Sequence, residues 1–201
     1  MNFHSILSTA GSVLALALFV PMIINVRRDG GAGQSFATWL LWAALDTTLT
    51  ITIYQQHGNF LIFTGFALGG IGMSIALISR GRFSWGWFET AVAFLVLGCE
   101  LIWKTAGPRM ATIAATAAVC VAGIPGLVAL WKNPDRKTGR LWWGYVLANG
   151  LAFLGGTAMT VEERMFPGVF TILSALMVVA AYRRPPFSKA GDAAAATLES
   201  R

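Results

Sequence analysis

Long apolar runs separated by short polar segments dominate the chain. A helix that crosses a bilayer needs about 20 mostly apolar residues, and seven runs meet that length: 6–26, 36–54, 60–79, 85–103, 110–131, 141–160 and 165–182. The second run is the most polar of them, because it contains Asp46 and several threonines. The pattern predicts an all-α integral membrane protein with seven transmembrane helices.

Polar and aromatic positions recur after about a hundred residues. A triplet with internal spacings of four and seven residues occurs twice: Ser35, Trp39 and Asp46, then Thr138, Trp142 and Asn149. Such duplication in a membrane chain predicts two three-helix repeats. With an unpaired fourth helix between them, both repeats have the same orientation. We therefore expect a first repeat at 1–84, a linker transmembrane helix at 85–108, a second repeat at 109–184 and a disordered cytoplasmic tail at 185–201.

Composition and charge support a membrane location. The chain has 201 residues, 56% hydrophobic and 12% charged, with a net charge of +6. Placing the loops on alternate sides leaves three basic residues on one side: Lys104, Arg109 and Arg164. The other side has the remaining twelve: Arg27, Arg28, Arg80, Arg82, Lys132, Arg136, Lys137, Arg140, Arg183, Arg184, Lys189 and Arg201. This asymmetry predicts a multi-pass protein of the cytoplasmic (inner) membrane, N-terminus outside and C-terminus cytoplasmic. It does not favour nucleic acid as a partner.

Asp46 is the sharpest candidate for a functional residue. It lies eleven residues after Ser35, which is roughly 16 Å along a helix and near the middle of a hydrocarbon core of about 30 Å. Ionisable groups at that depth are rare and normally face a cavity or a partner. The position favours binding of a polar or cationic group, or of a coupled proton. A protonated carboxyl that only packs against a neighbouring helix is the alternative.

Asn149 occupies the corresponding depth in the second copy. Its amide offers donors and acceptors, so it can orient a solute or form an interhelical hydrogen bond. Trp42 and Thr50 share a helical stripe with Asp46, and Tyr145 shares one with Asn149. Aromatic walls with one or two polar groups suit a small polar or amphiphilic solute. These five residues form the predicted substrate site between the second and sixth helices.

Other aromatic and charged residues have simpler interpretations. Trp39 and Trp142 lie near helix starts, where an aromatic belt at the membrane interface is expected. Glu100 and Lys104 are four residues apart and predict an ion pair near the outer end of the fourth helix. Glu89 falls in the first turn of that helix, where the helix dipole favours a carboxylate.

Pro21 and Pro125 interrupt the first helix of each predicted repeat. A proline removes a helical hydrogen bond and kinks the helix, so each marks either a hinge or a tolerated bend. Motifs of hydrolytic, phosphate-binding or metal chemistry are missing from the sequence. We therefore expect neither an enzyme nor a bound metal or cofactor.

The organisation of the chain resembles the SWEET and PQ-loop transporter superfamily, including the bacterial nicotinamide-riboside permeases. The resemblance covers about residues 6–184. It rests on two parallel three-helix repeats, a linker helix, the outside N-terminus, Pro21 and Pro125, and the loop ends Ser35 and Thr138. It implies a uniporter or proton-coupled carrier of small neutral solutes, working by alternating access between the repeats.

The leading hypothesis is that the protein lies in the lipid bilayer and carries a small polar or amphiphilic solute across it. Asp46 would bind the solute or a coupled proton, and Asn149 would orient the solute. The competing hypothesis is a non-transporting scaffold, accessory subunit or sensor with the same fold. Both leave homo-oligomerisation open.

Overall fold

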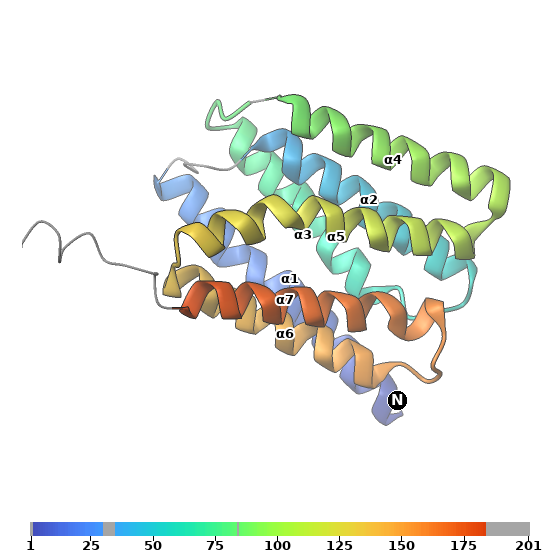
Figure 1. Ribbon diagram of the computed structural model, residues 1–201. Coiled ribbons are helices and arrows are strands. Elements are labelled where there is room, and N and C mark those ends of the chain that lie inside the picture. The colour runs from blue at the N-terminus through green and yellow to red at the C-terminus, as the bar shows by residue number, and fades with distance from the viewer. Residues whose placement is uncertain (1, 30–34, 84, 184–201) are drawn as a thin grey trace, which may run out of the picture.

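The chain folds into a bundle of helices that lie side by side (Figure 1). The computed structural model describes residues 2–29, 35–83 and 85–183, so the predicted tail at 185–201 lies outside the described residues. The helices are α1 (Phe3–Asp29), α2 (Phe36–Gln55), α3 (Leu61–Ile78), α4 (Trp87–Ala106), α5 (Pro108–Lys132), α6 (Arg136–Gly155) and α7 (Phe166–Tyr182). A π-helical turn, η1 (Val161–Met165), leads directly into α7.

Five helical segments in the described residues are long and apolar enough to cross a membrane. They are α1, α2, α3, α5 and the continuous η1–α7 segment. The fourth and sixth helices are more polar: α4 carries Glu89, Glu100 and Lys104, while α6 opens with Arg136 and Lys137. The prediction of an all-α chain with several membrane-type helices is thereby confirmed.

The sixth helix begins and ends about five residues earlier than predicted. Asp135 is its N-cap, and the carboxyl oxygens accept from the backbone N–H groups of Lys137 (3.0 Å) and Thr138 (2.9 Å). Thr138 therefore lies inside the first turn, and the prediction that it marks the helix start is wrong. Ser35 does mark the start of α2, where its hydroxyl accepts from Thr38 N–H.

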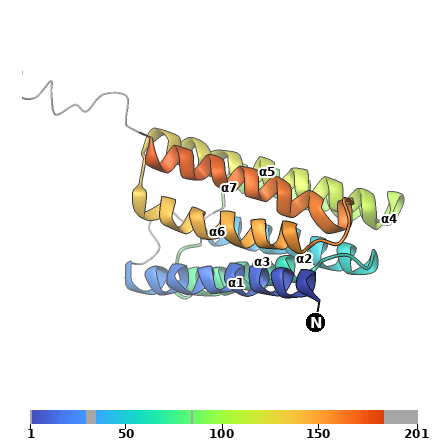
Figure 2. The same ribbon diagram turned by 90° about the horizontal axis from the view of Figure 1, so that it is seen from below.

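The third helix is central in each set of three. α3 packs against both α1 and α2, and α7 packs against both α5 and α6. The two sets meet where α1 packs against α6 and α2 packs against α5. α4 lies at the edge of the bundle against α2 and α5 (Figures 1 and 2).

The described basic residues gather mainly at one end of the bundle. Arg80 donates to the carbonyl of Arg27, Arg183 donates to the carbonyl of Trp131, and Phe36 N–H donates to the carbonyl of Arg82. These contacts join the end of α3 to the end of α1, the end of α7 to the end of α5, and the start of α2 to the segment after α3. We call this the basic end. The start of α1 lies at the other end of the bundle from the end of α7 (Figures 1 and 2).

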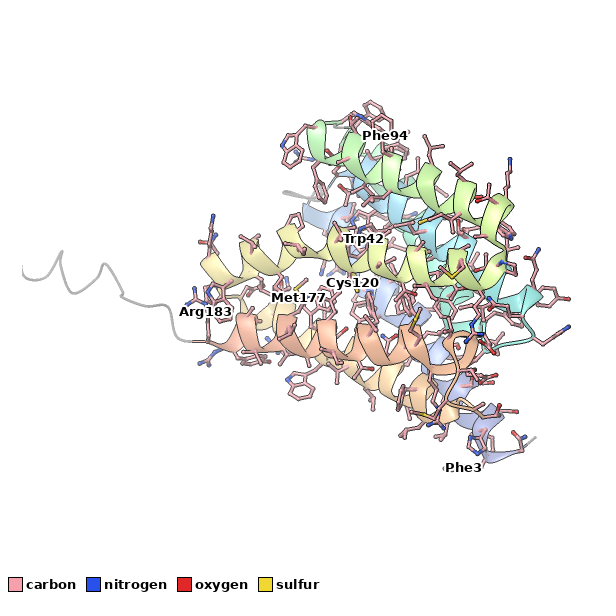
Figure 3. All side chains as sticks on the ribbon, turned by 45° about the vertical axis from the view of Figure 1, so that its right-hand side comes forward. Phe3, Trp42, Phe94, Cys120, Met177 and Arg183 are labelled. Carbon is pink, nitrogen blue, oxygen red and sulfur yellow. The ribbon has the colours of Figure 1, made fainter. Side chains whose placement is uncertain are left out.

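Large apolar side chains cover the outside of the bundle as well as its core. Phe63, Phe166, Leu45 and Leu49 are almost completely buried, whereas Phe94 is 69% exposed. Figure 3 shows Phe94 projecting outward from α4 while Trp42 lies among the helices. An apolar outer surface is typical of a protein that faces lipid.

Candidate functional site

A cavity of about 400 Å³ lies within the bundle. Every α-helix except α4 contributes to its walls. The lining residues are Phe19, Met22, Asn25, Trp39, Trp42, Asp46, Phe66, Gly70, Val119, Asp135, Lys137, Thr138, Leu141, Trp142, Tyr145 and Phe170. Its volume is in the range of pockets that bind small molecules.

Aromatic rings from several helices form a connected wall of this cavity. Phe19 of α1 makes edge contacts with Trp39 (centroids 5.9 Å apart) and Tyr145 (6.2 Å). Trp39 continues to Trp42 on the same helix at 5.7 Å. Phe66 of α3 joins Tyr145 at 5.9 Å. The wall is held by ring–ring packing.

Asp46 provides the carboxylate in this wall. It is the eleventh of the 20 residues of α2, and its side chain is only 7% exposed. No hydrogen bond or ion pair to the carboxyl oxygens is found among the described residues. A buried carboxylate without a partner is costly. A bound cation, a hydrogen-bond donor or protonation of the carboxyl would each remove this cost.

Two further polar groups lie close to this carboxylate. The Tyr145 hydroxyl donates to the sulfur of Met22 at 3.4 Å, and Tyr145 lines the cavity together with Asp46. Trp42 precedes Asp46 by one helical turn, and its indole N–H is buried without a partner in the described part of the chain. A buried indole N–H usually has an acceptor, so Trp42 is a candidate donor to a bound molecule.

The cavity reaches the surface at the basic end. Asp135 and Lys137 are exposed and line it, and Thr138 and Trp142 follow along α6. Hydrogen bonds from the side chain and backbone of Thr138 lower the pKa of Asp135, so its carboxylate stays ionised at neutral pH. Asp135 and Lys137 together give the mouth no net charge.

The other end of the bundle is closed by polar contacts around Asn59. Its Oδ1 accepts from the Ser8 hydroxyl (2.5 Å), its Nδ2 donates to the Ala152 carbonyl (3.4 Å), and its backbone N–H donates to the Glu162 carbonyl (3.3 Å). Deeper in, the rings of Phe63 and Phe166 meet at 4.7 Å, both almost fully buried. Asn59 and this ring pair separate the cavity from that end.

Three of the five predicted substrate residues line the cavity: Asp46, Trp42 and Tyr145. The other two do not. Asn149 is fully buried, and its Nδ2 donates to the carbonyl of Tyr145 at 2.9 Å on its own helix. Thr50 donates to the carbonyl of Asp46, also within its own helix. The substrate-binding role of all five stays a prediction.

Several cavity residues were not anticipated from the sequence. Trp39 and Trp142 were expected at the membrane interface, and they line the cavity. Phe19, Phe66 and Phe170 were not singled out at all. In helices this uniformly apolar, periodicity does not distinguish inward from outward faces. One sequence feature could have identified some of them: Phe19 lies close to Pro21, and Phe66 lies among the glycines of the third helix.

Pro21 and Pro125 lie inside α1 and α5, which continue through them. Pro21 directly precedes the cavity residue Met22, while the hinge role of both prolines stays a prediction. The expected Glu100–Lys104 ion pair is absent from the described residues. Instead, Glu100 accepts from the buried hydroxyl of Thr48 at 2.6 Å and ties α4 to α2. Glu100 is half-buried, so the hydroxyl of Thr48 on the neighbouring helix can satisfy its carboxylate, and the Glu100 side chain does not have to reach the surface.

No family model, curated protein or solved structure matches the chain.

Proposed function

We propose that this chain is a membrane carrier of a small polar or amphiphilic solute, which it moves without chemical conversion. The observation that carries the proposal is a cavity open at one end and closed at the other, with the unpartnered carboxylate of Asp46 in its wall. A carrier must expose its site to one side of the membrane at a time. The cavity has that form.

The packing of the helices supports two equivalent repeats. Exchanging α1 with α5, α2 with α6 and α3 with α7 converts the α1–α6 contact into the α5–α2 contact, and both contacts exist. The same exchange converts α1–α3 into α5–α7 and α2–α3 into α6–α7, which exist as well. The contacts of α4 with α2 and α5 lack counterparts, as expected for a linker helix, and so do those of the π-helical turn η1. This relation favours the three-plus-one-plus-three arrangement and the resemblance to SWEET and PQ-loop carriers.

Individual residues support the same two-fold relation. Phe63 and Phe166 are 103 positions apart and touch each other. A residue near a two-fold axis meets its own counterpart in this way. Asn59 and Glu162 are also 103 positions apart and are hydrogen-bonded through their backbones. The axis proposed here therefore passes through the closed end.

Counterpart arginines also occupy equivalent places at the basic end. Arg80 at the end of α3 donates to the last turn of α1, and Arg183 at the end of α7 donates to the last turn of α5. By the positive-inside rule, we assign this basic end to the cytoplasm. The cavity then faces inward, and rocking of one repeat against the other would break the Asn59 contacts and open the outer side.

Uptake into proteoliposomes tests the carrier function. For any solute that the unmodified protein takes up, Asp46→Asn should lower the uptake at least about tenfold. That is the effect of losing about 1.4 kcal/mol of binding free energy. Thr47→Val is the matched control, because Thr47 is the next residue but is exposed on the outer face of α2. Unchanged uptake in both Asp46→Asn and Tyr145→Phe would rule out this cavity as the transport site.

Thiol labelling tests the direction in which the cavity opens. In a background with Cys99→Ala and Cys120→Ala, Trp42→Cys should react with a polar, membrane-impermeant thiol reagent in inside-out vesicles. Thr47→Cys should be protected, because it faces lipid and not water. Protection of both positions from both sides would favour a non-transporting scaffold, accessory subunit or sensor.

A further inference from the structure

The walls of the cavity combine aromatic faces with one buried carboxylate. Trp42 and Tyr145 line it together with Asp46, and Phe19, Phe66 and Trp39 complete the wall around them. Aromatic rings attract cations through the negative potential of their faces, and the effect is largest where water is excluded. Both elements favour a positively charged occupant.

Among the described residues that line the cavity, Lys137 is the only cationic side chain, and it does not lie beside Asp46 in an ion pair. Lys137 lies at the exposed mouth beside Asp135, which accepts from its backbone N–H. Asp46 forms no ion pair with any described residue, and its side chain is only 7% exposed. An ionised carboxylate in this place requires a positive charge from a bound molecule.

The kind of cation follows from the small number of acceptors. A primary ammonium brings three N–H donors, and hard metal ions require six or more oxygen ligands. Apart from Asp46, the wall near Trp42 consists mainly of rings and apolar side chains. A fully alkylated ammonium has no N–H groups to satisfy, and aromatic cages are suited to it. The unpartnered indole N–H of Trp42 can in addition donate to an oxygen of the same molecule.

We propose that the cavity binds an organic cation with a fully alkylated ammonium group and a nearby oxygen acceptor, between the carboxylate of Asp46 and the rings of Trp42 and Tyr145. This identification of the solute class rests on the proposed carrier function. The binding site itself can be tested without transport, so that each can fail separately.

Choline and 3,3-dimethylbutan-1-ol form a matched pair of probes, because they share shape and hydroxyl and differ in one nitrogen replaced by carbon. The full chain is placed in nanodiscs of phosphatidylglycerol and phosphatidylethanolamine, and binding is measured by calorimetry. Choline should bind at least about tenfold more tightly than the neutral alcohol. Asp46→Asn should abolish that preference, Asp46→Glu should retain part of it, and Thr47→Val should leave it unchanged.

A second arm distinguishes a free solute from a lipid headgroup, which carries the same ammonium chemistry. Nanodiscs that contain phosphatidylcholine should still bind free choline. Loss of binding in those discs alone would assign the site to lipid and overturn a free solute as the occupant.

Equal binding of both probes, or binding of neither, would overturn the cation assignment. If Asp46→Asn then removed the pH dependence of uptake of a neutral solute, Asp46 would be a proton site, and the carrier function would stand. Selective choline binding with no uptake of choline would sustain the cation site and overturn the carrier function.

Discussion

The two contacts that join the halves of the bundle are counterparts under the proposed repeat, yet they are built differently. Where α1 meets α6, small residues bring the backbones together: a methyl group on Gly11 would stand 2.5 Å from the carbonyl oxygen of Ala148. Where α5 meets α2, buried hydroxyls link the helices, and Thr112 donates to Thr52 at 3.0 Å. The α1–α6 contact is therefore a close backbone approach, whereas the α2–α5 contact includes a hydrogen bond between side chains.

The sequence positions explain that difference. Gly11 corresponds to Ala115 at the shift of 104 residues that relates the first helices, and Ala148 corresponds to Leu45 at the shift of 103. Ala115 and Leu45 are larger than Gly11 and Ala148, so this pair does not permit the same close backbone approach. The same division applies to the central polar pair: Asp46 on α2 lines the cavity, whereas Asn149 on α6 is packed outside it.

Exchanging the residue types of Asp46 and Asn149 should give the largest change in the free energy of unfolding. Asn149→Asp introduces a carboxyl at a fully buried position, so we expect a loss of about 2 to 3 kcal/mol in the free energy of unfolding at pH 8. Asp46→Asn should leave stability unchanged or raise it, because it removes a buried carboxylate without a partner. Unfolding in mixed detergent micelles measures both. Equal losses in the two variants would mean that the two sites have the same environment.

The close approach of α1 and α6 should give the next effect. Gly11→Ala forces a methyl group against the backbone of Ala148 and should cost about 1 to 3 kcal/mol in unfolding free energy. Gly150→Ala is the matched control. Gly150 lies two residues after Ala148 in α6, and a methyl group added there would meet open space. That control should gain up to about 1 kcal/mol from helix propensity. If Gly11→Ala left the free energy of unfolding unchanged, the helices at this contact would be able to move apart at little cost.

Much of the fold could be predicted because length and apolarity determine which segments become membrane helices. The depth of Asp46 followed from its distance to Ser35, and its meeting with Trp42 and Tyr145 was anticipated. The orientation of Asn149 was not, because rotation of α6 depends on the packing of Gly11 against Ala148. Phe66 and Phe170 remained unrecognised, since their helices are apolar on every side.

The hydroxyl contact between α2 and α5 should give the smallest effect. Thr112→Val removes the donor to Thr52 and the acceptor for Gln56, whose Nε2 lies 2.9 Å away. Hydrogen bonds between membrane helices contribute about 0.6 kcal/mol on average, and we expect a loss of unfolding free energy of about that size. Thr116→Val is the matched control, because Thr116 is also buried on α5 but donates only within that helix. If both variants lose the same amount, the hydroxyls stabilise α5 itself. A larger loss in Thr112→Val would establish that polar side chains join α2 to α5, whereas the contact of α1 with α6 uses glycine.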